Sequence, residues 1–290
     1  MSYDDGDQSP LKSQDRDAQI LRIQWASGLD ILPFMPEFHY LSEWMKVIWS
    51  GDYTSFLKMI ESKSDKEVKK LMSRRETLCN ISAIFFVIHG ARVLFSNFPQ
   101  FSRDKELARI NLNVKNEHIK ILEKLLSLGC DVNARDFAGY SPLHHCCTMY
   151  GNEVTLKMAK RLIRAGADVN AKNRFGYTAI MEISMAHNRY DIFSFLLENG
   201  ANPYLECNEG YSPLTMARGN PKMMELIGKT YRTYVRQKRD KADAFWKCEV
   251  CQRSDKSNKK CAGCYHVWYC SSKCQRNDWP HHKIICKVRN

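Results

Sequence analysis

Apolar positions recur at three- and four-residue intervals through the middle of the chain, in short segments that each end at a glycine. Ile119, Leu122 and Leu125 form one such stripe, and Gly129 closes it. The pattern predicts short amphipathic helices, each ended by a glycine in the left-handed conformation. The apolar run at 81–88 is far shorter than the roughly 20 residues that span a bilayer, so we expect no membrane span.

Two motifs recur along these segments with the same spacing. The first reads L-L-S-L-G-C-D-V-N-A around Gly129, L-I-R-A-G-A-D-V-N-A around Gly166 and L-L-E-N-G-A-N-P around Gly200. The second reads G-Y-S-P-L-H, G-Y-T-A-I-M and G-Y-S-P-L-T, and begins ten residues after each of those glycines. The intervals are 37 and then 34 residues in both series, which indicates tandem structural repeats.

A period near 33 residues with a T-P-L-H motif is typical of ankyrin repeats, and this segment resembles that family. The resemblance implies an all-α ankyrin-repeat solenoid of helix-turn-helix repeats with short hairpin loops. It also places His144 at the histidine of the motif, whose ring forms hydrogen bonds within and between repeats. The ankyrin domain is expected over 18–228, with an N-terminal cap at about 41–64, a degenerate repeat at about 73–134 that contains an insertion at about 92–115, and repeats at about 135–171, 172–205 and 206–228.

The hairpin tips of the repeats carry aromatic and arginine side chains, which are enriched in binding hot spots. Two interpretations remain open. The tips form a face that docks a partner protein, or their tyrosines merely cover the adjacent hairpin. The candidate docking residues are Phe137, Tyr140, Arg174, Phe175, Tyr177 and Tyr211.

The last forty-three residues contain cysteine and histidine pairs with the spacing of zinc ligands. Two pairs have two residues between them, the spacing of a tight turn, and two pairs lie four positions apart, which puts both side chains on one face of a helical turn. The pairs are Cys248 with Cys251, Cys261 with Cys264, Cys270 with Cys274, and His282 with Cys286. Eight ligands suit two tetrahedral zinc ions, and a closed four-ligand shell builds structure rather than catalysing a reaction.

His282 is preferred over its neighbour His281 as a ligand. Four positions separate His282 from Cys286, which leaves the two side chains about 40° apart around a helix, whereas His281 is about 140° away. Spacing alone leaves open how the four pairs combine, because a sequential and an interleaved pairing both complete two tetrahedra.

The string C-E-V-C, C-A-G-C, Y-C-S-S-K-C-Q, D-W-P-H-H-K-I-I-C resembles the MYND-type zinc finger at all eight ligand positions, within residues 246–290. The resemblance implies a cross-brace in which one ion binds Cys248, Cys251, Cys270 and Cys274, and the other binds Cys261, Cys264, His282 and Cys286. It also implies that Gln275 and Trp279 bind a short proline-containing peptide, although Trp279 has the alternative role of a core residue over the zinc.

The formal net charge of +12 is concentrated at the C-terminal end. Residues 229–290 carry sixteen Lys and Arg against five Asp and Glu, so they hold +11 of it. The segment 229–245 is predicted to be a basic helical linker, with a weaker alternative as a nuclear-localisation signal. The acidic, polar segment 1–17 is expected to be disordered.

These features together predict a non-enzymatic adaptor in which the repeats hold one protein and the finger another. No P-loop, dinucleotide fingerprint or G-x-S-x-G motif indicates catalysis. The alternative is a nucleic-acid or chromatin-associated regulator that uses the basic C-terminal region, although no base-reading helix or RNA-stacking motif is evident. The five cysteines outside the finger are an odd number without framework spacing, and no secretory signal is visible, so we expect a cytoplasmic or nuclear location.

Overall fold

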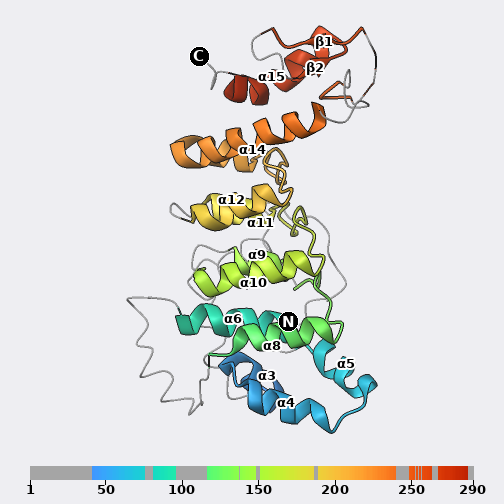
Figure 1. Cartoon of the computed structure of the whole chain (residues 1–290), viewed down its shortest axis with the longest axis vertical. Helices are drawn as coiled ribbons and strands as arrows, with labels where there is room; N and C mark the ends of the chain where they lie inside the picture. Colours follow the sequence, from blue (N-terminus) through green and yellow to red (C-terminus); the bar gives the residue numbers. More distant parts are fainter. Residues whose placement is uncertain are drawn as a thin grey trace.

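The computed structural model shows a stack of helical pairs that ends in a small finger (Figure 1). The residues it describes are 41–75, 81–95, 116–136, 138–147, 151–185, 189–239, 248–251, 253, 255, 257–262 and 267–286. Phe137, Cys264 and the segments 1–17 and 92–115, apart from 92–95, therefore lie outside the described residues. The predicted fold class, an all-α ankyrin solenoid followed by a MYND finger, is confirmed.

Each layer of the stack contains two helices that follow one another in the chain. In chain order the helices are α3 (Glu43–Ser50), α4 (Tyr53–Glu61), α5 (Asp65–Ser73), α6 (Ala83–Phe95), α8 (His118–Ser127), α9 (Pro142–Cys146), α10 (Glu153–Arg164), α11 (Ala179–Ser184), α12 (Tyr190–Glu198), α13 (Pro213–Met216), the 3-10 helix η2 (Ala217–Gly219) and α14 (Pro221–Arg239). The finger contains β1 (Lys259–Lys260), β2 (Trp268–Tyr269) and α15 (Ser272–Cys286). None of the helices within the described ranges is long and apolar enough to cross a membrane.

Local sequence signals account for the helix ends. The glycines that close three of the outer helices, Gly129, Gly166 and Gly200, have φ angles of 82°, 95° and 91°. Pro142 and Pro213 occupy the first turns of α9 and α13, where a missing N–H costs nothing. Apolar side chains from both helices of each layer then merge into one continuous core along the stack.

Two asparagines tie successive repeats together. Asn133 donates from Nδ2 to the carbonyl of Gly166 (3.2 Å) and accepts from the N–H of Asp168 (2.9 Å). Asn170 repeats both bonds one layer further on, to Gly200 (3.0 Å) and Asn202 (2.8 Å). The asparagine of the recurring D-V-N-A motif thus bonds each repeat to the next one, and these bonds hold successive repeats at a fixed separation.

His144 makes the contacts that the resemblance implies. Its Nδ1 accepts from the N–H of Ser141 (3.2 Å), and its Nε2 lies 2.9 Å from the carbonyl of Tyr177 in the next repeat. Beside it, His145 Nε2 is 2.9 Å from Asp136 Oδ2, with both side chains fully buried. The histidines are therefore structural links between the inner helices and the hairpins.

Two boundaries differ from those expected. Helix α6 continues to Phe95, so Arg92 is a buried helical residue and not the start of the insertion. Its guanidinium lies 3.0 Å from His89 Nδ1, which gives a charged side chain a partner inside the stack. The second difference is that α14 is one uninterrupted helix over Pro221–Arg239, so the basic linker continues the outer helix of the last repeat.

Gly176→Ala should destabilise the stack more than Gly210→Ala. Both glycines have φ near +80°, so each substitution carries the same left-handed strain of about 1–2 kcal/mol. A Cβ on Gly176 would also lie 2.6 Å from Asn208 Oδ1 and 2.7 Å from Asn208 N, whereas one on Gly210 would meet nothing within 4 Å. Chemical denaturation should show an additional loss of about 1–3 kcal/mol for Gly176→Ala. Equal losses would contradict close packing between the two hairpins.

Candidate metal centre and interaction surfaces

The finger is assembled from three short segments that meet around β2. Strand β1 pairs antiparallel with β2, with Lys259 opposite Tyr269. On the other side of β2, the N–H of Glu249 donates to the carbonyl of Trp268 (2.9 Å). The Tyr269 hydroxyl donates to Asp278 Oδ2 (2.5 Å), which fastens β2 to α15.

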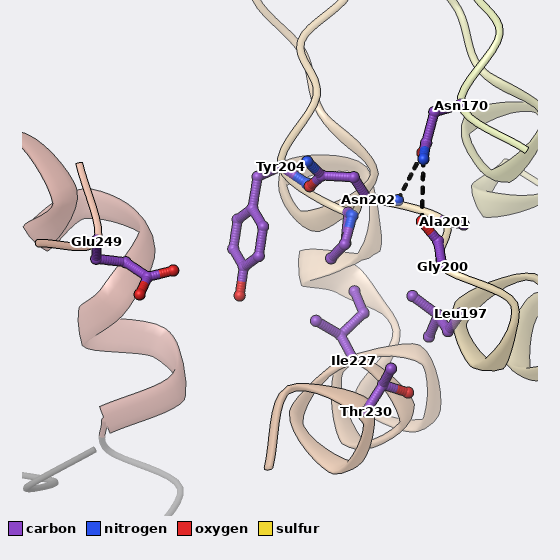
Figure 2. A pocket seen from close by; sticks show the side chains of 10 residues that line it. Asn170, Leu197, Gly200, Ala201, Asn202, Tyr204, Ile227, Thr230 and Glu249 are labelled. Atoms are coloured by element: carbon purple, nitrogen blue, oxygen red, sulfur yellow. Dashed lines mark hydrogen bonds between the residues drawn. The ribbon is translucent and has the colours of Figure 1, made fainter. Parts of the chain in front are cut away.

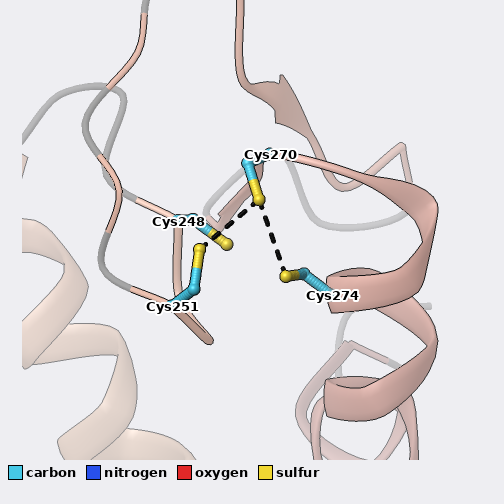
Figure 3. Close-up of side chains that lie close together, drawn as sticks. All are labelled: Cys248, Cys251, Cys270 and Cys274. Atoms are coloured by element: carbon cyan, nitrogen blue, oxygen red, sulfur yellow. Dashed lines mark hydrogen bonds between the residues drawn. The ribbon is translucent and has the colours of Figure 1, made fainter.

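The first cluster contains four cysteines from two places in the finger (Figure 3). Cys248 and Cys251 come from a turn before β1, Cys270 follows β2, and Cys274 lies in the first turn of α15. The Cys270 Sγ is 3.4 Å from Cys251 Sγ and 3.6 Å from Cys274 Sγ. The structure thus brings together the first and third pairs of the sequence pattern.

The second cluster lies toward the other end of α15. His282 and Cys286, one helical turn apart, meet Cys261, which follows β1. His282 Nε2 is 3.1 Å from Cys261 Sγ, and Cys286 Sγ is 3.8 Å from the same sulfur. The fourth predicted member, Cys264, lies outside the described residues. Helix α15 contributes candidate ligands to both clusters, and the described members of the two clusters are grouped as in the interleaved arrangement that spacing left open.

Both clusters fit a tetrahedral zinc ion. Zinc–sulfur bonds of about 2.3 Å place two sulfurs roughly 3.8 Å apart at the tetrahedral angle. The sulfur–sulfur separations of 3.4, 3.6 and 3.8 Å in the two clusters are close to this value. They are also far longer than a disulfide bond of about 2.05 Å, and these cysteines are free thiols. Sulfur and imidazole donors are the ligands that zinc prefers.

Backbone donors prepare one of the thiols for a metal. Burial raises the pKa of Cys248, but N–H groups of Cys251, Cys270 and Val250 outweigh that effect and lower its pKa to about 6. The thiolate is the form that binds zinc, so these N–H groups favour the metal-binding state.

The described part of the finger has a small apolar core. The buried apolar cluster that the structure describes there has five members, three of which are candidate metal ligands. The five are Cys248, Cys261, Val267, Tyr269 and Cys286. Chains of this length usually need a metal or disulfides to fold. Zinc bound at the clusters would therefore supply structure, with the shell closed to substrate.

The two predicted peptide-binding residues lie on one face of α15. Trp279 is 42 % exposed, and its ring centroid is 6.0 Å from that of His282. Gln275 precedes Trp279 by four positions and is half-buried, which puts both side chains on the same side of the helix. Trp279 therefore rests partly on a candidate ligand and presents the remainder of its surface to solvent.

The predicted docking residues on the hairpin tips differ in exposure. Tyr140 is 9 % exposed and Phe175 is 5 % exposed, so neither ring offers an open surface. The Tyr140 ring lies edge-on to those of His144 and His145, and the Phe175 ring is 6.4 Å from that of Tyr177. For these two residues the burial favours the interpretation that the rings cover the stack over that of a docking face. Tyr177 and Arg174 are half-buried, whereas Tyr211, on the last hairpin, is 53 % exposed.

A cavity that sequence reasoning missed lies where the last repeat meets the finger (Figure 2). It has a volume of about 360 Å³, and residues from α12, α14, the last hairpin and the finger line it. Tyr204 stands in it at the position that Asn133 and Asn170 hold in the earlier repeats. That exchange, N-P-Y-L in place of D-V-N-A, is the sequence signal that could have identified the site.

Comparison with known families agrees with this architecture. The MYND finger family matches residues 248–286, and the family of ankyrin repeats in three copies matches residues 110–201 and 149–237. The chain therefore belongs to the proteins that combine ankyrin repeats with a MYND-type zinc finger. Within that class, its arrangement is ankyrin repeats first and the finger second, and both are protein-interaction domains.

Relatives among curated proteins share a short segment. The zinc finger MYND domain-containing protein 10 homolog of Drosophila melanogaster is 54 % identical over 39 residues, which are 13 % of this chain and 8 % of that protein. The SET domain and MYND-type zinc finger protein 6 of Schizosaccharomyces pombe is 40 % identical over 49 residues, 17 % and 10 % of the two chains. The human N-lysine methyltransferase SMYD2 is 41 % identical over 39 residues, 13 % and 9 %. The matches span about a tenth of the relatives' length, and those to the methyltransferases cover the finger alone.

Proposed function

We propose that this protein is a non-enzymatic adaptor, in which the ankyrin stack docks one partner protein and the finger binds a short proline-containing peptide of another. The observation that carries the proposal is the exposed Trp279 beside Gln275, on a helix whose two ends belong to the two cysteine clusters. A large aromatic ring held rigidly at a surface suits proline, because a proline-containing segment has less conformational entropy to lose on binding.

In this proposal the finger holds two zinc ions, one on Cys248, Cys251, Cys270 and Cys274, and one on Cys261, Cys264, His282 and Cys286. Zinc supplies the fixed geometry of α15, and the protein's own side chains make the contacts with the peptide. Exposed basic residues of β1 and α15 favour a peptide in which acidic residues flank the proline. They are Lys259, Lys260, Lys273, Arg276 and Lys283.

The stack contributes a second surface at its last hairpin. Tyr211 is 53 % exposed there, and an exposed tyrosine offers apolar area and a hydroxyl at little entropic cost. We place the adaptor in a reducing compartment, the cytoplasm or the nucleus, because the five cysteines outside the finger are an odd number without the spacing of a disulfide framework.

Trp279→Ala should weaken binding of a proline-containing peptide at least tenfold, because the ring provides the main apolar contact. Peptides selected from a proline-containing library on the zinc-loaded full chain would be titrated by fluorescence polarisation. Met185→Ala is the matched control, since Met185 is also 42 % exposed but lies on the stack. The zinc content of both variants should equal that of the wild type.

Tyr211→Ala should leave peptide affinity unchanged and reduce capture of a protein held by the stack. Two results would contradict the proposal: library selection that yields no peptide with proline, or a Trp279→Ala variant that binds the selected peptide as tightly as the wild type does. Duplex DNA added as a competitor should not lower peptide affinity.

A further inference from the structure

Helix α5 is an addition to the repeat pattern, at the end of the stack that lies away from the finger (Figure 1). In the later layers, 14 residues connect the second helix of one layer to the first helix of the next, at 128–141, 165–178 and 199–212. The connection between α4 and α6, at 62–82, has 21 residues and contains α5. The other layers are joined without these extra residues, so α5 is available for another role.

Helix α5 is fixed to the stack along one side. Val68 and Met72, one helical turn apart, are buried on that side, and Leu71 is half-buried. Just after the helix, Arg75 Nη1 donates to the carbonyl of Arg135 in the hairpin that follows α8 (2.7 Å). These contacts hold the opposite side of α5 toward solvent in a fixed orientation.

The solvent side of α5 carries three exposed lysines, Lys66, Lys69 and Lys70, which form its lysine face. Their spacing of three and four positions from Lys66 places them together, opposite the buried side of the helix. None of the three forms an ion pair or a hydrogen bond with the residues that the structure describes. Like charges at these spacings destabilise a helix, so a partner with negative charge would relieve the repulsion.

The carboxylates of the same helix do not neutralise the lysine face. Glu67 Oε2 accepts from the N–H of Ser64 (2.9 Å) and from its hydroxyl (2.6 Å), so this carboxylate caps the start of the helix. Asp65 lies in the first turn, where the helix dipole favours a negative charge. Residues 58–75 contain seven Lys and Arg against three Asp and Glu, a net charge of +4, whereas the rest of residues 1–228 sums to −3.

The size and charge of the lysine face favour a short acidic segment of a protein. Helix α5 has nine residues and is about 13 Å long, a length that about four extended residues cover. A long polyanion such as duplex DNA would extend beyond α5, toward parts of the chain whose net charge is negative. Binding to a membrane surface would need exposed apolar side chains beside the lysines, but those of Val68 and Met72 are buried.

We propose that the lysine face of α5 binds a short acidic segment of a partner protein, whose carboxylates pair with the three ammonium groups. This inference rests on the proposed function in one respect, namely that the stack holds a partner protein. It adds the chemistry of that partner and a contact in the first part of the stack, whereas Tyr211 lies on the last hairpin. Salt should weaken the contact, because exposed charge pairs are screened.

The test uses the zinc-loaded full chain with isotope-labelled methyl groups, and follows the methyl resonances of Leu71 at low ionic strength. The probe is an acetylated hexapeptide amide of alternating aspartate and glutamate, and the matched probe is the same peptide made of asparagine and glutamine. The acidic peptide should shift the Leu71 resonances, and the uncharged peptide should bind at least tenfold more weakly. Equal binding of the two peptides, or no shift with the acidic one, would overturn the proposal.

Lys66→Gln, Lys69→Gln and Lys70→Gln, combined in one chain, should weaken the acidic peptide at least tenfold. Glutamine has nearly the helix propensity of lysine and removes the repulsion, so the midpoint of thermal unfolding should stay the same or rise. A fall in that midpoint would show instead that the lysines stabilise the stack, which contradicts a binding role.

The control removes three other exposed lysines that already have carboxylate partners on their own helices. Lys120 pairs with Glu117 on α8 (2.6 Å), Lys157 with Glu153 on α10 (2.7 Å), and Lys222 with Glu225 on α14 (3.0 Å). Lys120→Gln, Lys157→Gln and Lys222→Gln in one chain should keep the affinity within threefold of the wild type. Equal losses in the two triple variants would overturn the assignment to α5.

Two further comparisons separate the sources of negative charge. A short DNA duplex should shift the Leu71 resonances less than the hexapeptide does at the same concentration and ionic strength, and a larger shift would contradict a protein partner. Asp4→Asn, Asp5→Asn and Asp7→Asn in one chain should leave the affinity for the hexapeptide unchanged. Tighter binding by that variant would assign the lysine face to the chain's own acidic segment.

The lysine face and the finger should fail independently. Trp279→Ala should leave binding of the acidic hexapeptide unchanged, and the triple lysine variant of α5 should bind the selected proline-containing peptide as the wild type does. Loss of both activities in either variant would contradict two separate surfaces.

Discussion

Cys270→Ala is expected to unfold the finger and to leave most of the helical signal of residues 41–228 in place. Cys270 Sγ lies within 3.6 Å of two other candidate ligands, so its loss opens the first metal shell. The zinc-binding free energy of such sites is about 10–16 kcal/mol in finger peptides, far more than a core of this size contributes. The helical far-UV circular dichroism signal should therefore fall only by the amount that α15 contributes to it.

Zinc release, followed with a chromophoric chelator, gives the second readout of this variant. Cys130→Ala is the matched control, because Cys130 is a half-buried free thiol of the stack, outside both clusters. It should keep the zinc content of the wild type. Collapse of the stack's helicity in Cys270→Ala would show instead that the repeats and the finger unfold as one cooperative unit.

Acidification from pH 7.5 to pH 5 should lower the free energy of unfolding of the stack by about 4 kcal/mol. Burial lowers the pKa of His118 to about 4 and that of His144 to about 3, although a backbone carbonyl partly offsets each shift. In the unfolded chain both titrate near 6.5, so below that pH the unfolded state binds more protons and gains stability. Each histidine then costs about 2 kcal/mol at pH 5.

The loss should begin near pH 6.5 and continue as the pH approaches the folded values. Above pH 6.5 these groups contribute no pH dependence. Burial, with the charge of Arg92 beside it, also lowers the pKa of His89, which adds a loss in the same direction. Urea unfolding at the two pH values, followed by circular dichroism at a helical wavelength, measures the effect. Equal free energies of unfolding at the two pH values would contradict the conclusion that these histidines are buried and neutral in the folded stack.

His144→Thr provides the control for this prediction. In the last repeat, Thr215 occupies the equivalent position and donates its N–H to the Ser212 hydroxyl, so threonine is compatible with this helix start. The variant removes one titrating group, and its stability loss between pH 7.5 and pH 5 should be smaller by about 2 kcal/mol. A loss of the same size as in the wild type would assign the acid sensitivity to other groups.

The sequence predicted the features that depend on local geometry. The glycines after α8, α10 and α12 and the four-position spacing of His282 and Cys286 are constraints within one turn of a helix, so they can be recognised without tertiary structure. Spacing could not predict the interleaved pairing of the cross-brace, because a sequential pairing has the same spacing. That prediction came from the resemblance to the MYND family. The structure places Cys248 with Cys270 and Cys261 with His282, on opposite ends of α15.

Features that depend on neighbouring layers were harder to predict. The burial of Tyr140 and Phe175 depends on how the folded stack packs around each ring, which no single motif encodes. Arg92 interrupts an apolar run and so resembled a boundary, whereas His89 gives its charge a partner inside α6. Tyr204 was overlooked because its role depends on the finger, which lies more than forty residues further along the chain.

In the function proposed for this protein, two zinc ions build the finger. Native mass spectrometry of the full chain, purified without chelator, measures it directly. We predict a mass increase that corresponds to two zinc ions per chain, with both lost together on acid denaturation. A folded finger that carries one zinc ion or none would contradict the account.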